Sequence, residues 1–289
     1  MDKGRLSASN VPRLLRELGL RPRKELGQHF LIDQRALARI VAAAELTEED
    51  TVVEIGAGLG TLTHLLAQAA GKVIAVELDR ALVAALSQLL ADEPHVTIVQ
   101  GDILEFTPAD LLIRADLAPH TPYLVVGNLP YGITSAVLRH FLEAERRPQR
   151  LVVTVQREVA ERISARPGEM SLLSVSVQFY GSPQVVLRLK PGAFYPSPQV
   201  SSAVLRVDCY DDPLLAEDST SFFRIVRAGF SQRRKQLHNS LSAGLALADD
   251  QAKAALREAE IDPRRRPQTL SVEEWLALHR TLSPIVGTD

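Results

Sequence analysis

The sequence predicts an α/β fold in which a parallel sheet carries helices on both faces, followed by a smaller all-helical domain. Between residues 50 and 160, short β-branched runs alternate with amphipathic stretches of helical length. Strands separated by helices rather than by tight turns pair in parallel. After residue 211 no further strand-like run occurs, and the remaining periodic segments are typical of helices.

Five runs are expected to form the parallel sheet, with helices between them. The strands are Thr51–Ile55, Lys72–Glu77, Val96–Gln100, Tyr123–Val126 and Leu151–Gln156, and the helices are Leu62–Ala69, Arg80–Leu90 and Ser135–Glu143. Right-handed crossovers place the carboxyl ends of the strands along one edge, where open α/β sheets bind ligands. Two later runs, Gln184–Lys190 and Ser201–Cys209, are joined by a Pro-rich loop and are expected to add antiparallel strands at one side.

The predicted domains are residues 1–211, with a basic N-terminal arm at 1–31, and residues 212–289. A short helix, Val11–Leu18, precedes the sheet. Helices of the second domain are expected at Ser221–Phe230, Lys235–Ala246, Gln251–Glu260 and Val272–Leu282. The last of these follows Ser271 and has Glu274 three residues later, which is the spacing of a capping box.

Composition narrows the class of protein. The 289 residues have a formal net charge of −2, with 46% hydrophobic and 24% charged residues, as in ordinary globular chains. The single cysteine, Cys209, excludes an internal disulfide and fits a reducing, cytoplasmic compartment. Since it lies in an alternating strand, we interpret it as a structural thiol. The charged N-terminus lacks a following apolar run, and no stretch approaches the roughly 20 apolar residues of a membrane span.

A glycine loop follows the first strand of the sheet. Gly56, Gly58 and Gly60 have the spacing G-x-G-x-G, whereas dinucleotide-binding loops have G-x-G-x-x-G. Glu77 ends the second strand, where a carboxylate binds ribose hydroxyls in such sheets. Asp102 follows the third strand and can accept a hydrogen bond from an adenine amine. The set predicts a site for S-adenosylmethionine, which needs close backbone approach but no pyrophosphate cradle.

The tetrapeptide Asn128-Leu129-Pro130-Tyr131 at the end of the fourth strand is the most specific signal. The lone pair of an adenine N6 is delocalised into the ring, so the amine is a weak nucleophile. Two acceptors, the Asn128 side-chain carbonyl and the Leu129 backbone carbonyl, can bind its two protons and favour a tetrahedral nitrogen. Pro130 stiffens the turn, and Tyr131 offers a face for base stacking. No metal or general base is required, so the sequence predicts a Rossmann-like class I methyltransferase that acts on adenine in RNA.

With these residues in view, the chain resembles the small-subunit rRNA adenine N6-dimethyltransferases, the kasugamycin-sensitivity type. The similarity extends from Arg23–Leu31 to the helical C-terminus and includes Glu54–Thr63, Asn128–Tyr131 and Phe194–Ser202. It implies that two adjacent adenosines in a 3′-terminal hairpin loop of 16S rRNA become N6,N6-dimethyladenosine. The substrate would be the small ribosomal subunit or its precursor, and the enzyme a cytoplasmic monomer.

The resemblance also implies roles for individual residues. Phe194 would sandwich the target base opposite Tyr131. The family's cofactor contacts fall on His29, Leu31, Gly56, Glu77, Asp102 and Asn128. The family often has Asn where this chain has His29, and Pro where it has Ala57.

Basic residues form three clusters despite the negative net charge. Arg21, Arg23 and Lys24 lie near the expected cofactor mouth, Arg264–Arg266 follow Pro263, and the third cluster is Arg224, Arg227, Arg233, Arg234 and Lys235. Phosphate contacts of this kind position RNA without reading its sequence. We expect Arg23, Lys24, Arg227, Arg233, Arg234 and Lys235 to bind rRNA.

Three other functions are compatible with parts of this pattern. A nicotinamide-dependent oxidoreductase is disfavoured by the glycine spacing and the tetrapeptide. A large-subunit rRNA adenine N6-methyltransferase of the macrolide-resistance type is disfavoured by the long helical C-terminal region. A ribosome-assembly or transcription factor without activity is disfavoured by the intact tetrapeptide.

Overall fold

The computed structural model describes residues 6–211, 219–232 and 234–286. Contacts divide the chain into two units: the described residues of 1–160 and 182–209 form the first, and those of 161–181 and 210–289 form the second. The predicted division at residue 211 put the segment 161–181 in the first domain, whereas the contacts assign it to the second unit. The reason is aromatic packing, because Phe179 stacks on Phe222 at a ring-centroid distance of 4.6 Å and contacts Phe223 at 5.1 Å.

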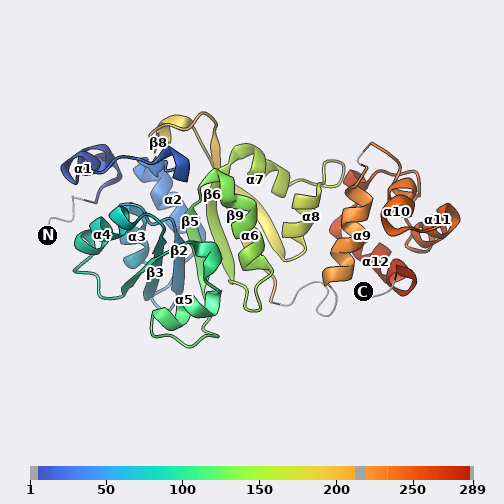
Figure 1. Ribbon diagram of the computed structural model, residues 1–289, viewed down its shortest axis with the longest axis horizontal. Helices are drawn as coiled ribbons and strands as arrows, with labels where there is room; N and C mark the ends of the chain where they lie inside the picture. The colour runs from blue at the N-terminus through green and yellow to red at the C-terminus, as the bar shows by residue number, and fades with distance from the viewer. Residues whose placement is uncertain (1–5, 212–218, 233, 287–289) are drawn as a thin grey trace. The chain divides into compact units, whose positions relative to one another are not determined.

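The first unit is built on a seven-stranded sheet with the order β4-β3-β2-β5-β6-β9-β7 (Figure 1). Its strands are β2 (Thr51–Ile55), β3 (Lys72–Glu77), β4 (Val96–Gln100), β5 (Leu124–Asn128), β6 (Arg150–Gln156), β7 (Gly181–Leu189) and β9 (Ser202–Cys209). Neighbouring strands from β4 to β6 pair in parallel, and β9 pairs antiparallel with β6. The predicted parallel sheet with an antiparallel addition is confirmed, although β5 extends to Asn128 and so includes the first residue of the tetrapeptide.

Helices cover both faces of this sheet, which explains why all five residues of β2 are buried. The helices are α1 (Val11–Glu17), α2 (Gln34–Ala44), α3 (Thr61–Ala67), α4 (Arg80–Leu89), α5 (Pro108–Arg114) and α6 (Thr134–Leu142). Val52 and Val73 pack with α2 and α3 in one core cluster, while α6 lies on the opposite face (Figure 1). Asp33 caps α2, accepting from the amides of Arg35 and Ala36 at 2.9 and 3.1 Å. Neither α2 nor α5 is among the predicted helices.

A short ribbon lies apart from the main sheet. It pairs β1 (Phe30–Leu31) antiparallel with β8 (Phe194–Tyr195), so that Leu31 lies opposite Phe194. Residues opposite each other in such a pair share one face, and here that face is the core: Leu31 and Phe194 are 4% and 3% exposed. Tyr195, on the other face, is 39% exposed.

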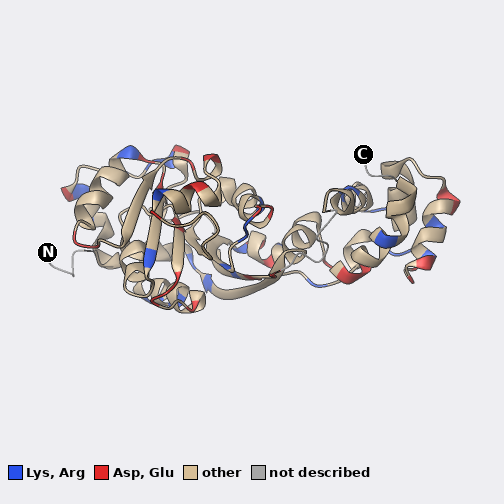
Figure 2. Ribbon diagram, turned by 90° about the horizontal axis from the view of Figure 1, so that it is seen from below, with Lys and Arg blue, Asp and Glu red and all other residues tan. Residues whose placement is uncertain are grey.

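The second unit is helical in its described residues. It contains α8 (Leu172–Gln178), α9 (Ser219–Phe230), α10 (Leu237–Leu245), α11 (Asp249–Glu258) and α12 (Val272–Val286), while α7 (Arg157–Ile163) spans the division between units. The predicted capping box is confirmed, because the Glu274 amide donates to Ser271 Oγ and the Ser271 amide donates to Glu274 Oε2. Figure 2 shows basic and acidic residues interspersed along these helices. No helix in the described part of the chain is long and apolar enough to cross a membrane.

Candidate active site

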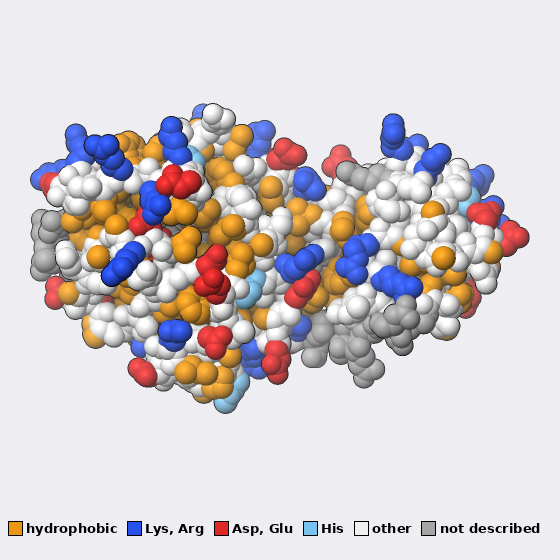
Figure 3. All heavy atoms as spheres, viewed as in Figure 1, with side chains coloured by type: hydrophobic (Ala, Val, Ile, Leu, Met, Phe, Trp, Pro, Cys, Tyr) orange, Lys and Arg blue, Asp and Glu red, His pale blue; other side chains and the backbone are white. Residues whose placement is uncertain are grey.

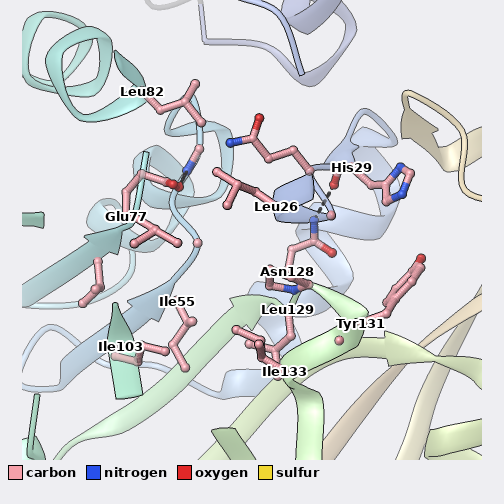
Figure 4. A pocket seen from close by; sticks show the side chains of 18 of the residues that line it. Leu26, His29, Ile55, Glu77, Leu82, Ile103, Asn128, Leu129, Tyr131 and Ile133 are labelled. Atoms are coloured by element: carbon pink, nitrogen blue, oxygen red, sulfur yellow. Dashed lines mark hydrogen bonds between the residues drawn. The ribbon is translucent and has the colours of Figure 1, made fainter. Parts of the chain in front are cut away.

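A pocket of about 410 Å³ lies at the carboxyl ends of the parallel strands. Small-molecule sites typically have about 300–1,000 Å³. Its wall consists of the glycine loop after β2, the ends of β3, β4 and β5, and residues 24–30 of the N-terminal segment (Figure 4). The predicted site residues that line it are His29, Gly56, Glu77, Asp102, Asn128, Leu129, Pro130 and Tyr131. The sheet edge therefore brings most of the predicted site together.

Glu77 fastens the glycine loop to the end of β3. Its Oε2 accepts from the amide of Gly58 and its Oε1 from the amide of Asp79, both at 2.9 Å. Gly56 and Gly58 have φ values of 73° and 60°, which favour glycine. Glu77 is 7% exposed, and burial raises the pKa of its carboxyl although these amides partly offset the effect. The carboxylate is thus fixed at the pocket wall by two backbone donors.

The remaining carboxylates give the pocket an acidic wall. Asp102 Oδ1 accepts from the amide of Leu104 at 3.0 Å, so this side chain is held beside the pocket that it lines. Glu25 also lines the pocket. Among the described lining residues, Lys24 is the one with a basic side chain of lysine or arginine type. A cationic sulfonium fits a wall in which three carboxylates face one lysine, whereas a pyrophosphate would face an excess of negative charge. The residues present therefore fit S-adenosylmethionine.

Asn128 is oriented by the N-terminal segment. Its Nδ2 donates to the backbone carbonyl of His29 at 2.7 Å (Figure 4). With the amide nitrogen engaged, the side-chain oxygen is the atom presented to the pocket. The amide of Leu129 donates to the carbonyl of Thr154 at 3.2 Å, and no hydrogen bond from a described backbone amide reaches the Leu129 carbonyl. Two consecutive residues of the pocket wall thus each have a carbonyl oxygen that these hydrogen bonds do not use.

Tyr131 is held on both its hydroxyl and its ring. The hydroxyls of Tyr131 and Ser202 share a hydrogen bond of 2.6 Å. The His29 ring stacks on Tyr131 with a centroid distance of 5.9 Å and an interplanar angle of 23°, while His29 Nδ1 donates to the carbonyl of Pro196 at 2.7 Å. The His29 side chain thus contacts Tyr131 and Pro196, while residue 29 lines the pocket.

Two predicted site residues are not at the pocket. Phe194 and Leu31 belong to the core cluster formed with α2 and the sheet, and neither lines the pocket. The alternation of the β1–β8 ribbon directs both side chains inward. A base sandwiched between Tyr131 and Phe194 would require the Phe194 ring to leave this core, and the sandwich stays a prediction.

The predicted RNA-binding residues lie at separate places. Lys24 lines the pocket, and Arg23, whose side chain is 52% exposed, bonds Glu25 at 3.1 Å. In the second unit, Arg227 in α9 and the loop residues Arg234 and Lys235 are exposed; Arg233 lies outside the described residues. Figure 3 shows Lys and Arg side chains scattered over the visible face rather than gathered in one stripe.

Residues that the sequence analysis did not single out complete the pocket. Gln28 donates to Asp79 Oδ2 at 3.2 Å and accepts from the Arg23 amide at 2.8 Å, which ties the N-terminal segment to the start of α4. At Gly27 an added Cβ would lie 3.5 Å from Pro130 Cβ, so the segment passes close to the tetrapeptide. Gly27 and Gln28 were recognisable as part of the basic N-terminal arm. The sequence carries no signal for the residues that they contact.

Cys209 is a half-buried cysteine at the end of β9. Burial raises the pKa of its thiol to about 12, so the thiolate needed for reactivity is scarce at neutral pH. The interpretation of Cys209 as a structural thiol agrees with this environment.

Glu54 in β2 is a buried carboxyl from which we expect a pH-dependent stability. It is 1% exposed, its Oε2 has no hydrogen-bond partner among the described residues, and burial raises its pKa to about 8, with Glu77 adding to the effect. The folded state therefore holds a proton that the unfolded chain releases near pH 4.5. This stabilisation is complete below the unfolded pKa and is lost as pH rises through the folded pKa.

Glu54→Gln is expected to reduce that loss. Because one pKa unit corresponds to about 1.4 kcal/mol, the unaltered protein should lose several kcal/mol relative to the variant between pH 5 and pH 9. Urea unfolding of both proteins across this range measures the difference. Parallel pH profiles would show that Glu54 is not protonated in the fold. Glu48→Gln, which changes an exposed glutamate, serves as the control.

Comparison with known proteins agrees with the fold and the site. The sheet, the glycine loop and the pocket are those of a Rossmann-like class I methyltransferase. The model of the family described as ribosomal RNA adenine dimethylase matches residues 19–282. The chain belongs to this family, which confirms the predicted enzyme class, an rRNA methyltransferase that uses S-adenosylmethionine.

Individual relatives and structures agree with this assignment. Ribosomal RNA small subunit methyltransferase A of Dehalococcoides mccartyi is 47% identical over 281 residues, which cover 94% of this chain and 95% of the relative. The protein of the same name from Moorella thermoacetica is 47% identical, covering 93% and 95%. The crystal structure of the 23S rRNA methyltransferase ErmE has a TM-score of 0.69 and 29% identity, covering 86% of this chain and 98% of ErmE. A dimethyladenosine transferase from Plasmodium falciparum shares the fold, with a TM-score of 0.74 and 22% identity, covering 85% and 94%.

Proposed function

We propose that the protein dimethylates N6 of two adjacent adenosines in a 3′-terminal hairpin loop of 16S rRNA during small-subunit biogenesis. The observation that carries this proposal is the orientation of Asn128. Its nitrogen is bound by His29, and its oxygen is left for a donor in the pocket, next to the Leu129 carbonyl. Two adjacent acceptors match the two protons of an exocyclic amine.

The chain's own residues position the reacting amine. The Asn128 and Leu129 oxygens accept its protons, which directs the nitrogen lone pair away from the base plane and into the pocket. Fixed acceptors of this kind need no reorganisation during the reaction, and alignment of reactants is worth effective molarities on the order of 10⁵–10⁸ M. When bound, S-adenosylmethionine supplies an electrophilic methyl group on a cationic sulfur. Glu77 and Asp102 bind the ribose and adenine of the cofactor in this proposal.

Tyr131 stacks on the target base. One face of its ring is occupied by His29, so the base takes the other face. Its hydroxyl, bound to Ser202, keeps the ring from rotating away. Base–aromatic stacking contributes roughly 1–3 kcal/mol per base, which helps to hold a base that has left its loop.

The rRNA is held outside the pocket by basic residues. Arg23 and Lys24 lie where RNA would enter, and Arg227, Arg234 and Lys235 are exposed in the second unit. In this proposal the enzyme acts in the cytoplasm as a monomer on the small subunit or its precursor. The small-subunit relatives at 47% identity favour this substrate over that of the large-subunit enzyme, which is 29% identical.

Methyl transfer tests the proposal directly. The protein is incubated with labelled S-adenosylmethionine and either small subunits that lack the modification or large subunits, and the rRNA is digested to nucleosides. We expect N6,N6-dimethyladenosine in 16S rRNA alone. Label confined to 23S rRNA would establish the large-subunit activity instead, and absence of label in both would contradict the proposed function.

A further inference from the structure

A second hollow of the first unit is lined by basic side chains. Arg35 and Arg39 of α2 line it together with Arg188 of β7 and Lys190 just after β7. We call these four residues and the surface between them the basic groove. Residues four apart on a helix share a face, and residues two apart on an extended strand do so as well. The spacing thus presents both pairs of cations to the same hollow.

Three of the four cations of the groove, Arg35, Arg39 and Lys190, are not neutralised by the described residues. All four cations are exposed, and Arg35, Arg39 and Lys190 form no ion pair with a described carboxylate. Asp33 alone is acidic among the described lining residues, and its Oδ1 already accepts from the amides of Arg35 and Ala36. Like charges four apart destabilise a helix slightly, so the arrangement favours an external anion over a structural role.

The basic groove begins where the active-site pocket ends. His29 and Phe30 line the pocket, while Ile32 and Asp33 line the groove. The β1–β8 ribbon lies between them and is closed by the hydrogen bond from the Ile32 amide to the Ala193 carbonyl, 2.8 Å long. Three residues of extended chain span about 10 Å. Nucleotides next to a base held in the pocket can reach this distance.

We propose that the basic groove binds the phosphodiester backbone of the rRNA segment that flanks the target adenosines. The inference rests on the proposed function and adds a second anchoring site in the catalytic unit itself. Phosphate contacts fix register without reading sequence. The groove therefore determines how the hairpin loop is presented to Asn128 and Leu129, while the pocket determines which atom reacts.

Removing the α2 cations tests the groove. Arg35→Gln/Arg39→Gln is compared with Arg13→Gln/Arg139→Gln, which removes two exposed helical arginines of the same unit. Binding to unmodified small subunits is measured between 50 and 200 mM salt. Each lost contact with single-stranded phosphate lowers the slope of log K against log salt by about 0.7. We expect the groove variant to bind about tenfold more weakly at physiological salt, with a slope about 1.4 smaller, and the control to be unchanged.

A second variant separates folding from binding. Arg39 Nη2 donates to the Val186 carbonyl at 3.4 Å, so its substitution also removes a contact within the fold. Lys190→Gln, on the other side of the groove, is therefore measured as well. It should lower the slope by about 0.7 while S-adenosylmethionine binding by calorimetry stays unchanged. If groove variants and control bind the subunits alike, the groove proposal is wrong even when the unaltered protein methylates 16S rRNA. If that protein transfers no methyl group but the variants bind more weakly, the proposed function fails while the groove remains an RNA-binding site.

Discussion

Asn128→Ala is expected to lower kcat for methyl transfer by about 100- to 1,000-fold, the usual cost of removing one preorganised hydrogen-bonding group at a reacting atom. The variant leaves only the Leu129 carbonyl to orient the amine. It also removes the hydrogen bond that Asn128 Nδ2 donates to the His29 carbonyl in the unaltered protein. The affinity for small subunits should change little, because the groups proposed to hold RNA are elsewhere. Labelled methyl transfer at saturating cofactor gives kcat, and filter binding gives the affinity.

Two further variants test whether this loss of activity comes from the missing Asn128 oxygen. Asn239→Ala changes an exposed asparagine of the second unit and should leave kcat unchanged. Asn128→Asp keeps an oxygen facing the pocket but loses the donor to His29, so its carboxylate is no longer locked in place. We expect it to retain more activity than Asn128→Ala but far less than the unaltered protein. Near-normal dimethyladenosine production by Asn128→Ala would rule out the acceptor role.

The parallel sheet could be predicted because its strands are buried on both faces. Runs rich in Val and Ile, such as Val52–Ile55 and Val73–Val76, leave few alternatives, and glycines or carboxylates mark their ends. The β1–β8 ribbon could not be predicted. Two-residue strands carry no periodicity, and Phe30–Leu31 and Phe194–Tyr195 are brought together only by the tertiary fold.

The site was predictable where a residue lies at or just after the carboxyl end of a strand. Glu77, Asp102 and Asn128 reach the pocket because carboxyl ends of parallel strands share one edge. The burial of Phe194 could not be predicted, since it depends on the register of a ribbon that the sequence does not reveal. For the same reason Gln28 was missed: its partner Asp79 lies 51 positions away in the chain. Contacts between distant loops have no local signal.

Glu77→Ala is expected to weaken S-adenosylmethionine binding by at least about 100-fold. The variant removes the acceptor of the Gly58 and Asp79 amides, and a buried donor left unpaired costs about 1–3 kcal/mol. The glycine loop then loses its attachment to β3, and the proposed contact with the ribose is lost as well. Isothermal titration with the cofactor measures the affinity. Glu105→Ala, at an exposed glutamate that does not line the pocket, is the control.

The pH dependence of binding distinguishes the charge of Glu77 from its shape. Burial raises the pKa of this carboxyl, and the ionised form is the one that accepts hydrogen bonds from both amides and from a ribose. Affinity should therefore fall as the pH is lowered, beginning at a higher pH than for an ordinary glutamate, because protonation removes an acceptor. Glu77→Gln keeps the shape but cannot titrate, so its weaker binding should be nearly independent of pH in the same range. If the unaltered protein and Glu77→Gln showed the same profile, another group would control cofactor binding, and Glu77 would serve only to hold the loop.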